Sequence, residues 1–164
     1  MTPNEGTALR KQIINTLSGH ESHIDFESAL EDFPAALRGR KPVGARHSAW
    51  QLLEHMRIAQ KDILEFSKDP HHKSPKWPDE YWPQTAAPPD LEAWNSSIRA
   101  FQKDAEELEA IVQNPRADLF QPFEHGAGQT LLREALLAAA HNSYHLGQLV
   151  FLKKMLLAEQ SASA

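Results

Sequence analysis

Hydrophobic residues recur along much of this chain with the spacing of amphipathic helices. The clearest pattern repeats at intervals of three and four residues and consists of Leu91, Trp94, Ile98, Phe101, Ala105, Leu108 and Val112. This spacing forms the seam by which a helix packs into a bundle. Asp90 stands where an N-cap is expected, and Asn114-Pro115 ends the pattern. The sequence therefore predicts a core-facing helix between Asp90 and Asn114.

A second apolar pattern predicts a helix from Ser48 to about Ser67. Gln51 follows Ser48 by three residues, which is the spacing of a capping box. The apolar face of this helix comprises Leu52, Leu53, Met56, Ala59, Ile63 and Phe66. The opposite side, which we expect to face solvent, carries Glu54, Arg57, Lys61, Glu65 and Lys68.

The most apolar segment predicts a last helix from about Thr130, after the breaker at 126–128, to about Ala158. Leu137 and Phe151 widen its apolar face, so we expect it to be the central helix of a bundle. Two further helices are predicted near the N-terminus. One carries Leu9, Ile13 and Leu17 and ends at Ser18-Gly19, and a shorter one spans 26–33 before Pro34.

The connection from Asp69 to Pro89 is rich in proline and much longer than the usual link between bundle helices. A helix of 20 residues is about 30 Å long, so this crossover can span the bundle and let the helices on either side run parallel. No strand alternation interrupts the helical patterns. We therefore predict an all-α four-helix bundle in up-down-down-up order with one additional short helix, as a single domain over residues 1–164.

Composition narrows the possible functions. Hydrophobic residues make up 41% and charged residues 24% of the chain, the usual balance of a globular domain. The net charge of -5 argues against nucleic-acid binding. The nearest approach to a basic cluster, Arg38, Arg40, Lys41 and Arg46, straddles a turn, and we interpret it as a solvated connection. No apolar run has the length of a signal peptide or membrane span, so we expect a cytoplasmic protein.

The chain contains nine histidines and no cysteine, so a transition-metal site would have to use imidazole or carboxylate ligands. His141 and His145 are four residues apart on the apolar face of the last predicted helix. That spacing alone is close to chance, but buried polar side chains are costly unless they are paired or bind a metal. His55 lies at the edge of the apolar stripe of its helix and points into a seam between helices. Together His55, His141 and His145 predict one metal site.

Three neutral imidazoles suit zinc, nickel, copper or ferrous iron better than magnesium or calcium. Because three protein ligands leave coordination positions open, such a site can bind water or a substrate. The alternative from the residues alone is that these are ordinary core or surface histidines with hydrogen-bond partners.

Several other residues could serve the site. Gln148 and Tyr144 neighbour the histidine pair by helical spacing, with Gln148 the nearer, and Asn142 or Glu134 could orient an imidazole. The crossover carries three aromatic residues, Trp77, Tyr81 and Trp82, that could form a lid over an apolar substrate. The favoured interpretation is that they pin the loop to the bundle.

The remaining histidines are expected to lie in loops. His47, His71 and His72 are interpreted as solvated loop residues. His20 and His23 lie at the break between the first two helices, and His23 is the one that could reach the site. Glu124 and His125, beside the start of the last helix, are the loop candidates for general acid or base chemistry.

Three segments resemble the DinB-like superfamily of metal-dependent enzymes. They are HSAWQLLEHMRIAQKDILEF from His47, SPKWPDEYWP from Ser74 and GQTLLREALLAAAHNSYHLGQLVFLKKML from Gly128. The most specific parts are the H-x3-H within HNSYHLGQ and the histidine of LLEHM, which correspond to the metal ligands of that family. The resemblance, which covers nearly the whole chain, thus implies that His141, His145 and His55 are ligands. It also implies an up-down-down-up four-helix bundle and a homodimer.

Members of that family with assigned roles include transferases and isomerases that use low-molecular-weight thiols such as bacillithiol or mycothiol, and others are described as hydrolase-like. The resemblance therefore implies a metal-dependent hydrolase or thiol-dependent transferase, with zinc or nickel as the favoured ion and a small molecule as substrate. It assigns no general acid, base or thiol-binding residue. The alternative is a non-catalytic bundle, with or without a structural metal, that binds a ligand or partner.

Overall fold

The structure is a computed structural model that describes residues 2–19 and 23–162. Its helices are α1 (Pro3–Ser18), α2 (Phe26–Leu30), α3 (Ala49–Lys68), α4 (Leu91–Gln113) and α5 (Leu131–Ala162), with two 3-10 turns, η1 (Ala35–Leu37) and η2 (Asp79–Tyr81). The described residues form no strand, only one isolated bridge between Pro122 and Thr130. The prediction of four main helices and one short helix is confirmed.

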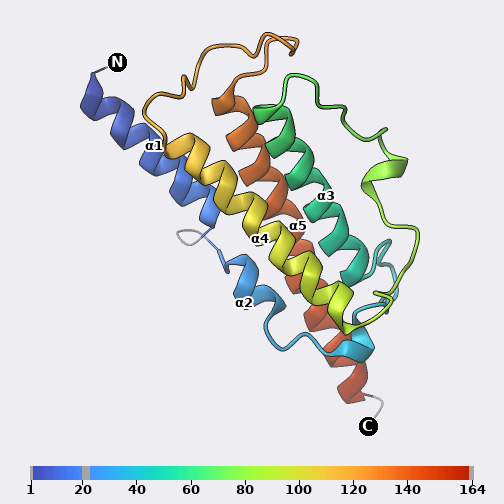
Figure 1. Cartoon of the computed structure of the whole chain (residues 1–164). Helices are drawn as coiled ribbons and strands as arrows, with labels where there is room; N and C mark the ends of the chain where they lie inside the picture. Colours follow the sequence, from blue (N-terminus) through green and yellow to red (C-terminus); the bar gives the residue numbers. More distant parts are fainter. Residues whose placement is uncertain (1, 20–22, 163–164) are drawn as a thin grey trace.

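The four long helices are arranged in up-down-down-up order (Figure 1). In that view α1 and α5 run in one direction and α3 and α4 in the other, and the crossover returns along the outside from the end of α3 to the start of α4. α5 contacts each of the other four α-helices, which agrees with its predicted central place. None of the described helices is long and apolar enough to cross a membrane.

Local capping explains why the predicted helix boundaries hold. Ser48 and Gln51 form the predicted capping box at the start of α3, and Asp90 accepts from the Ala93 amide at the start of α4. α1 ends at Gly19, whose φ of 72° is the left-handed conformation that glycine adopts at low cost. These signals are local in sequence, so the sequence alone can predict such helix ends. Two ends differ from the prediction: α5 continues past Ala158 to Ala162, and the short helix predicted over 26–33 ends at Leu30.

The core consists of two apolar clusters with a polar layer between them. On α3, the first cluster includes Met56 and the second begins at Ile63, with buried Gln60 in between. On α5, the second cluster ends at Ala138 and the first begins at Leu146, and the predicted histidine pair lies in that interval. The same layer on α4 contains buried Asp104. Polar groups in such a layer require partners, because burial without hydrogen bonds is costly.

Several residues differ in exposure from the prediction. On α4, Leu91 belongs to the predicted seam but is 60% exposed. On α5, Leu137 is 38% exposed and Phe151 is 65% exposed, because no described element covers that side of the helix. In the opposite sense, Glu54 and Arg57 were expected in solvent but form a half-buried ion pair with an N–O distance of 2.8 Å.

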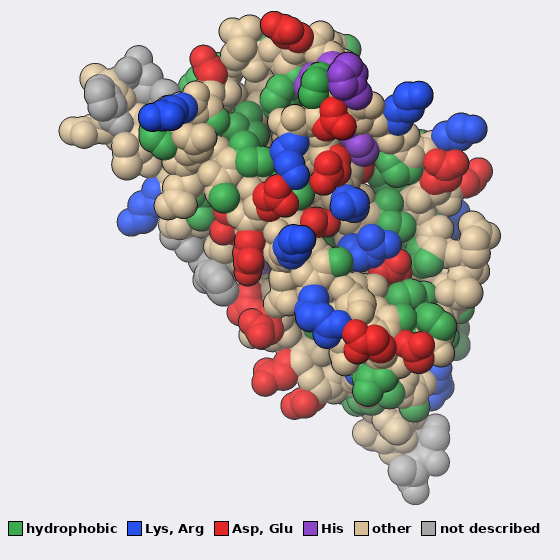
Figure 2. Space-filling view, in the orientation of Figure 1, with side chains coloured by type: hydrophobic (Ala, Val, Ile, Leu, Met, Phe, Trp, Pro, Cys, Tyr) green, Lys and Arg blue, Asp and Glu red, His purple; other side chains and the backbone are tan. Residues whose placement is uncertain are grey.

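Arg38 also departs from the solvated connection predicted for the basic residues. It is half-buried, donates to the Phe33 carbonyl at 3.2 Å, and lies over the Trp94 ring at 4.6 Å. On the face shown in Figure 2, acidic and basic side chains are interspersed.

The hydroxyl of Ser48 offers a test of how α3 is held. It accepts from the Gln51 amide at 3.2 Å and donates to the Ala86 carbonyl, so it joins the start of α3 to the crossover. We expect Ser48→Ala to lower the free energy of unfolding by about 1–2 kcal/mol, as measured by urea denaturation. Ser96→Ala is the matched control, because Ser96 is exposed and bonds only within α4. Equal effects of the two substitutions would contradict this role.

Candidate metal centre

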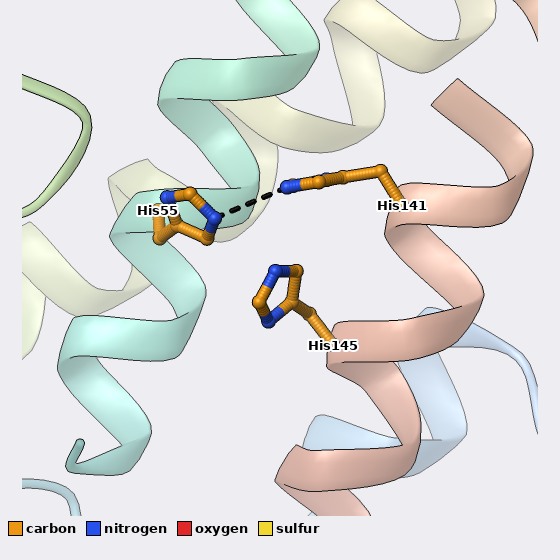
Figure 3. A group of neighbouring side chains, drawn as sticks. All are labelled: His55, His141 and His145. Atoms are coloured by element: carbon orange, nitrogen blue, oxygen red, sulfur yellow. Dashed lines mark hydrogen bonds between the residues drawn. The ribbon is translucent and has the colours of Figure 1, made fainter. Parts of the chain in front are cut away.

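The three histidines predicted as ligands come together between α3 and α5. Figure 3 shows the His55 ring of α3 facing those of His141 and His145 from successive turns of α5. One ring nitrogen from each residue lies within 4.8 Å of the others. His55 is 1% exposed and His145 is 7% exposed, while His141 is half-buried. The structure thus forms a buried cluster of three imidazoles that could hold a metal ion, and His55 is deeper than the edge position predicted for it.

The spacing of the rings suits a shared cation. The Nε2 atoms of His55 and His141 are 3.1 Å apart. Two nitrogens bound tetrahedrally to zinc at about 2.0–2.1 Å would be about 3.3 Å apart. Little movement of the side chains would therefore bring these two nitrogens to ligand positions.

Hydrogen bonds to the opposite ring nitrogens set the protonation of two rings. His55 Nδ1 lies 2.9 Å from the Tyr81 carbonyl oxygen, and His145 Nδ1 lies 2.9 Å from Gln148 Oε1. Because these oxygens can only accept, each Nδ1 carries the proton and each neutral ring presents an Nε2 lone pair. Such outer hydrogen bonds are typical of histidine ligands. Gln148, one of the residues that could serve the pair, thus makes a hydrogen bond to His145, and Tyr81 contacts His55 through its backbone carbonyl.

His141 differs because its Nδ1 is buried without a hydrogen-bond partner. If His55 Nε2 is a lone pair, then the contact with His141 requires His141 to donate from Nε2, which leaves its Nδ1 as an acceptor without a donor. With a cation at the Nε2 atoms, His141 Nδ1 instead carries a proton. A buried acceptor without a partner, Asn142 Oδ1, stands on the adjacent residue. The convergence of three ring nitrogens, two of them on rings whose Nδ1 atoms are already bonded, therefore fits a bound cation.

Asn142 also connects the cluster to the polar layer of α3. Its side-chain amide donates to Gln60 Oε1 at 2.7 Å. Glu134, the other residue proposed to orient an imidazole, does not reach the rings. It is buried two turns before His141 and pairs with Arg133 at 2.7 Å. Tyr144 is 65% exposed and touches the His145 ring edge-on, with centroids 4.9 Å apart.

Burial keeps the three rings neutral. Burial, and to a smaller extent the neighbouring imidazoles, lowers the pKa of His55 and the pKa of His141 to about 4. For His55, the hydrogen bond to Tyr81 opposes this shift in part. Burial also lowers the pKa of His145. At neutral pH the rings are therefore in the deprotonated state that metal ligation requires.

The crossover covers one side of the cluster through Trp82. Its ring stacks on His55 with centroids 3.8 Å apart and planes inclined by 6°, and on its other face it stacks on His47 at 3.9 Å and 11°. His47 is a loop residue, as predicted, but it is half-buried beside the centre rather than solvated. No periodic pattern could have placed it, because it precedes the N-cap of α3.

Asp62 of α3 anchors the same part of the crossover. Its two carboxylate oxygens accept from the Tyr81 hydroxyl at 2.5 Å and pair with His72 Nε2 at 2.7 Å. The interpretation that Tyr81 and Trp82 pin the loop is thus confirmed, whereas Trp77 remains 72% exposed. His72 was expected in solvent, but its pairing with Asp62 holds it against α3.

The other candidates lie away from the cluster. His125 Nε2 donates to the Phe66 carbonyl at 2.9 Å. Phe66 follows His55 by 11 residues on α3, about 16 Å along a helix, so neither His125 nor its neighbour Glu124 is brought to the rings. His23 bonds to Ser143 at 2.9 Å, on another side of α5, and does not join the cluster. His20 lies outside the described residues.

The fold and this centre define a class of protein, a four-helix bundle with a buried three-histidine cluster between two antiparallel helices. Comparison with protein-family models matches the DinB superfamily over residues 20–149, which include all three histidines. The chain therefore belongs to the DinB superfamily, and the resemblance inferred from its motifs is confirmed. Comparisons with curated proteins and with solved structures gave no significant match.

The lowered pKa values predict how acid affects the metal-free protein. The unfolded chain takes up protons at its histidines near pH 6.5, whereas His55 and His141 stay neutral in the folded chain down to about pH 4. The free energy of unfolding should therefore fall as the pH drops from about 7.5 to about 5, by on the order of 1 kcal/mol per ring.

Urea denaturation of chelator-treated protein at the two pH values measures this loss. A His55→Gln/His141→Gln double variant should lose less stability over the same interval. An identical loss in the variant and the parent chain would show that the two rings do not titrate as described.

Proposed function

We propose that this chain binds one divalent transition-metal ion through the Nε2 atoms of His55, His141 and His145, and that it is a metal-dependent enzyme acting on a small molecule. The observation that carries the proposal is the convergence of the three rings while the Nδ1 atoms of two are bound by neutral acceptors. A structural role for histidines would not need their Nε2 atoms to face a common point.

The donor set favours zinc or nickel, with iron or copper as further possibilities. All three donors are neutral imidazoles, and the chain has no cysteine to offer a thiolate. Magnesium and calcium prefer oxygen ligands. When bound, such an ion supplies Lewis-acid chemistry at its remaining coordination positions.

An open coordination shell supports a catalytic rather than a structural metal. Within the described part of the chain, no fourth histidine or carboxylate joins the cluster. Structural zinc sites in proteins are almost always closed by four protein ligands. The non-catalytic alternative predicts a closed shell, which the arrangement of these residues does not favour.

The residues around the rings would hold the centre rigid and partly dry. Tyr81 and Gln148 fix the orientation of His55 and His145, and Trp82 shields one face of His55 from water. The reaction would be a hydrolysis or a transfer that uses a low-molecular-weight thiol, the two classes that the resemblance implies.

Metal analysis tests the proposal directly. Protein purified without chelator and loaded with zinc or nickel should carry about one equivalent of metal per chain. His145→Ala should reduce this to background, because two remaining imidazoles bind the ion weakly. His125→Ala is the matched control, since that ring lies at the other end of α3 and should leave the metal content unchanged. Full occupancy in the His145→Ala protein would refute the ligand assignment.

The melting temperature separates a catalytic from a structural ion in the same samples. For the catalytic role, the metal-free chain should keep its helical circular dichroism and a cooperative unfolding transition, because the apolar clusters do not depend on the ion. Loss of the folded state on metal removal would instead support a structural metal.

Asp62 should act on the centre through Tyr81, as a positioning residue. We expect Asp62→Ala to raise the metal dissociation constant by about tenfold or more, because the Tyr81 carbonyl that orients His55 loses its anchor. Asp62→Asn keeps an acceptor for the Tyr81 hydroxyl and should restore much of the affinity. The measurement is competition with a chromogenic chelator at a temperature where all variants are folded.

Lys61→Ala serves as the control for this series, because Lys61 is an exposed neighbour on α3 that forms a long ion pair with Glu65 at 3.9 Å. Equal affinities of the Asp62→Ala and Lys61→Ala proteins would show that Asp62 does not position His55.

A further inference from the structure

A cavity of about 420 Å³ lies beside Gln148, the hydrogen-bond partner of His145. One wall is the loop 42–47, and the other is formed by Leu52 of α3 and by Gln148, Phe151, Leu152 and Met155 of α5. This size falls within the range of about 300–1,000 Å³ typical of small-molecule sites. Most of the lining side chains are apolar, so the cavity favours a ligand with an apolar body.

The cavity lies along the same seam as the imidazoles. Leu52 precedes His55 by about one turn of α3, and Gln148 follows His145 by about one turn of the antiparallel α5. One helical turn is about 5.4 Å. Gln148 belongs to both sites, because its Oε1 accepts from His145 Nδ1 while the residue lines the cavity. A molecule in the cavity would therefore lie beside Gln148, about one helical turn from His145.

The charge of the cavity is positive. Arg46 is the one permanently charged residue of its lining, and this exposed side chain makes no ion pair within the described residues. His47, in the same wall, experiences this field: burial lowers its pKa first, and the charges of Arg46 and Lys41 lower it further. In a chain with a net charge of -5, an unpaired guanidinium beside an apolar cavity favours an anionic ligand.

A second cavity shares Arg46 and His47 but differs in character. It measures about 830 Å³ and lies against the crossover, where Asp79 contributes a carboxylate to the wall. That carboxylate would oppose an anion. The smaller cavity between the loop and α5 is therefore the better fit to an anionic ligand with an apolar body.

We propose that the cavity bounded by loop 42–47 and α5 binds the substrate, a small organic anion whose apolar body packs against Leu52 and Leu152 and whose charge pairs with Arg46. The group that reacts would lie at the Gln148 end, next to the imidazoles. This assignment rests on the proposed metal-dependent function and adds to it a substrate class and a specificity-determining residue.

Three probes with the same octyl chain test the proposal on the metal-loaded protein. Octane-1-sulfonate is an anion and a poor metal ligand, octan-1-ol is neutral, and octyltrimethylammonium is a cation. By titration calorimetry the sulfonate should bind at least about tenfold more tightly than the alcohol, and the cation should bind least. Equal affinities of the sulfonate and the alcohol would overturn the anionic assignment.

Methyl NMR locates the bound probe. Met155 lines the cavity, whereas Met56 is fully buried in the core. In protein labelled at the methionine methyl groups, the Met155 signal should shift and saturate with the calorimetric dissociation constant. A bound sulfonate that leaves the Met155 signal unchanged would place it elsewhere and refute the site.

Matched charge variants test the role of Arg46. Arg46→Gln should weaken sulfonate binding about tenfold and leave the alcohol unaffected. Arg40→Gln removes the same charge from a residue that does not line the cavity and lies 3.7 Å from Glu159, and it should leave both affinities unchanged. An unaltered sulfonate affinity in Arg46→Gln would remove Arg46 from the site.

Two further measurements separate this proposal from the metal assignment. Sulfonate should still bind the metal-free His145→Ala protein, because the cavity wall does not include the His145 ring. If the parent chain instead carries no metal but binds sulfonate, the proposed metal-dependent function is contradicted and the cavity assignment is not. In cobalt-loaded parent protein, saturating sulfonate should shift the visible absorption of the ion through Gln148 and His145. An unchanged cobalt spectrum would overturn the link between the cavity and the centre.

Discussion

The need to satisfy imidazoles buried inside a helical bundle is the constraint on which the rest of this structure depends. The cluster lies where one apolar core region gives way to another, and the rings of His55 and His145 are buried there. Burial makes unpaired polar groups costly. Tyr81 and Gln148 satisfy two Nδ1 atoms, and the Nε2 atoms are left facing one another, an arrangement that a cation would stabilise.

The long crossover has two roles in this structure: it connects α3 to α4, and it contributes groups that contact the buried imidazoles. Its length lets α3 and α4 run parallel, and its middle supplies the Tyr81 carbonyl and the Trp82 ring to the centre. Asp62 ties this segment back to α3. The packing of the crossover and the orientation of His55 are therefore coupled. A substitution far from the ring nitrogens can thus alter metal affinity.

Periodicity and spacing predicted much of the fold and the three clustered histidines, but they predicted exposure less well. Leu137 and Phe151 lie on an apolar side of α5 that nothing described covers, and Glu54, placed on the polar side of α3, is half-buried. A helical wheel shows which residues share a side. It does not show which sides neighbouring helices cover, because this depends on crossing geometry and on how many helices surround each one.

The sequence by itself determined where α3 and α4 begin and the spacing of His141 and His145, because capping and helical periodicity act within a few residues. Only the tertiary structure decided that Trp82 lies between His47 and His55, that Asp62 holds Tyr81, and that loop 42–47 encloses a cavity beside Gln148. Those contacts join segments far apart in the chain. Their partners are selected by how the whole bundle packs, which no local pattern records.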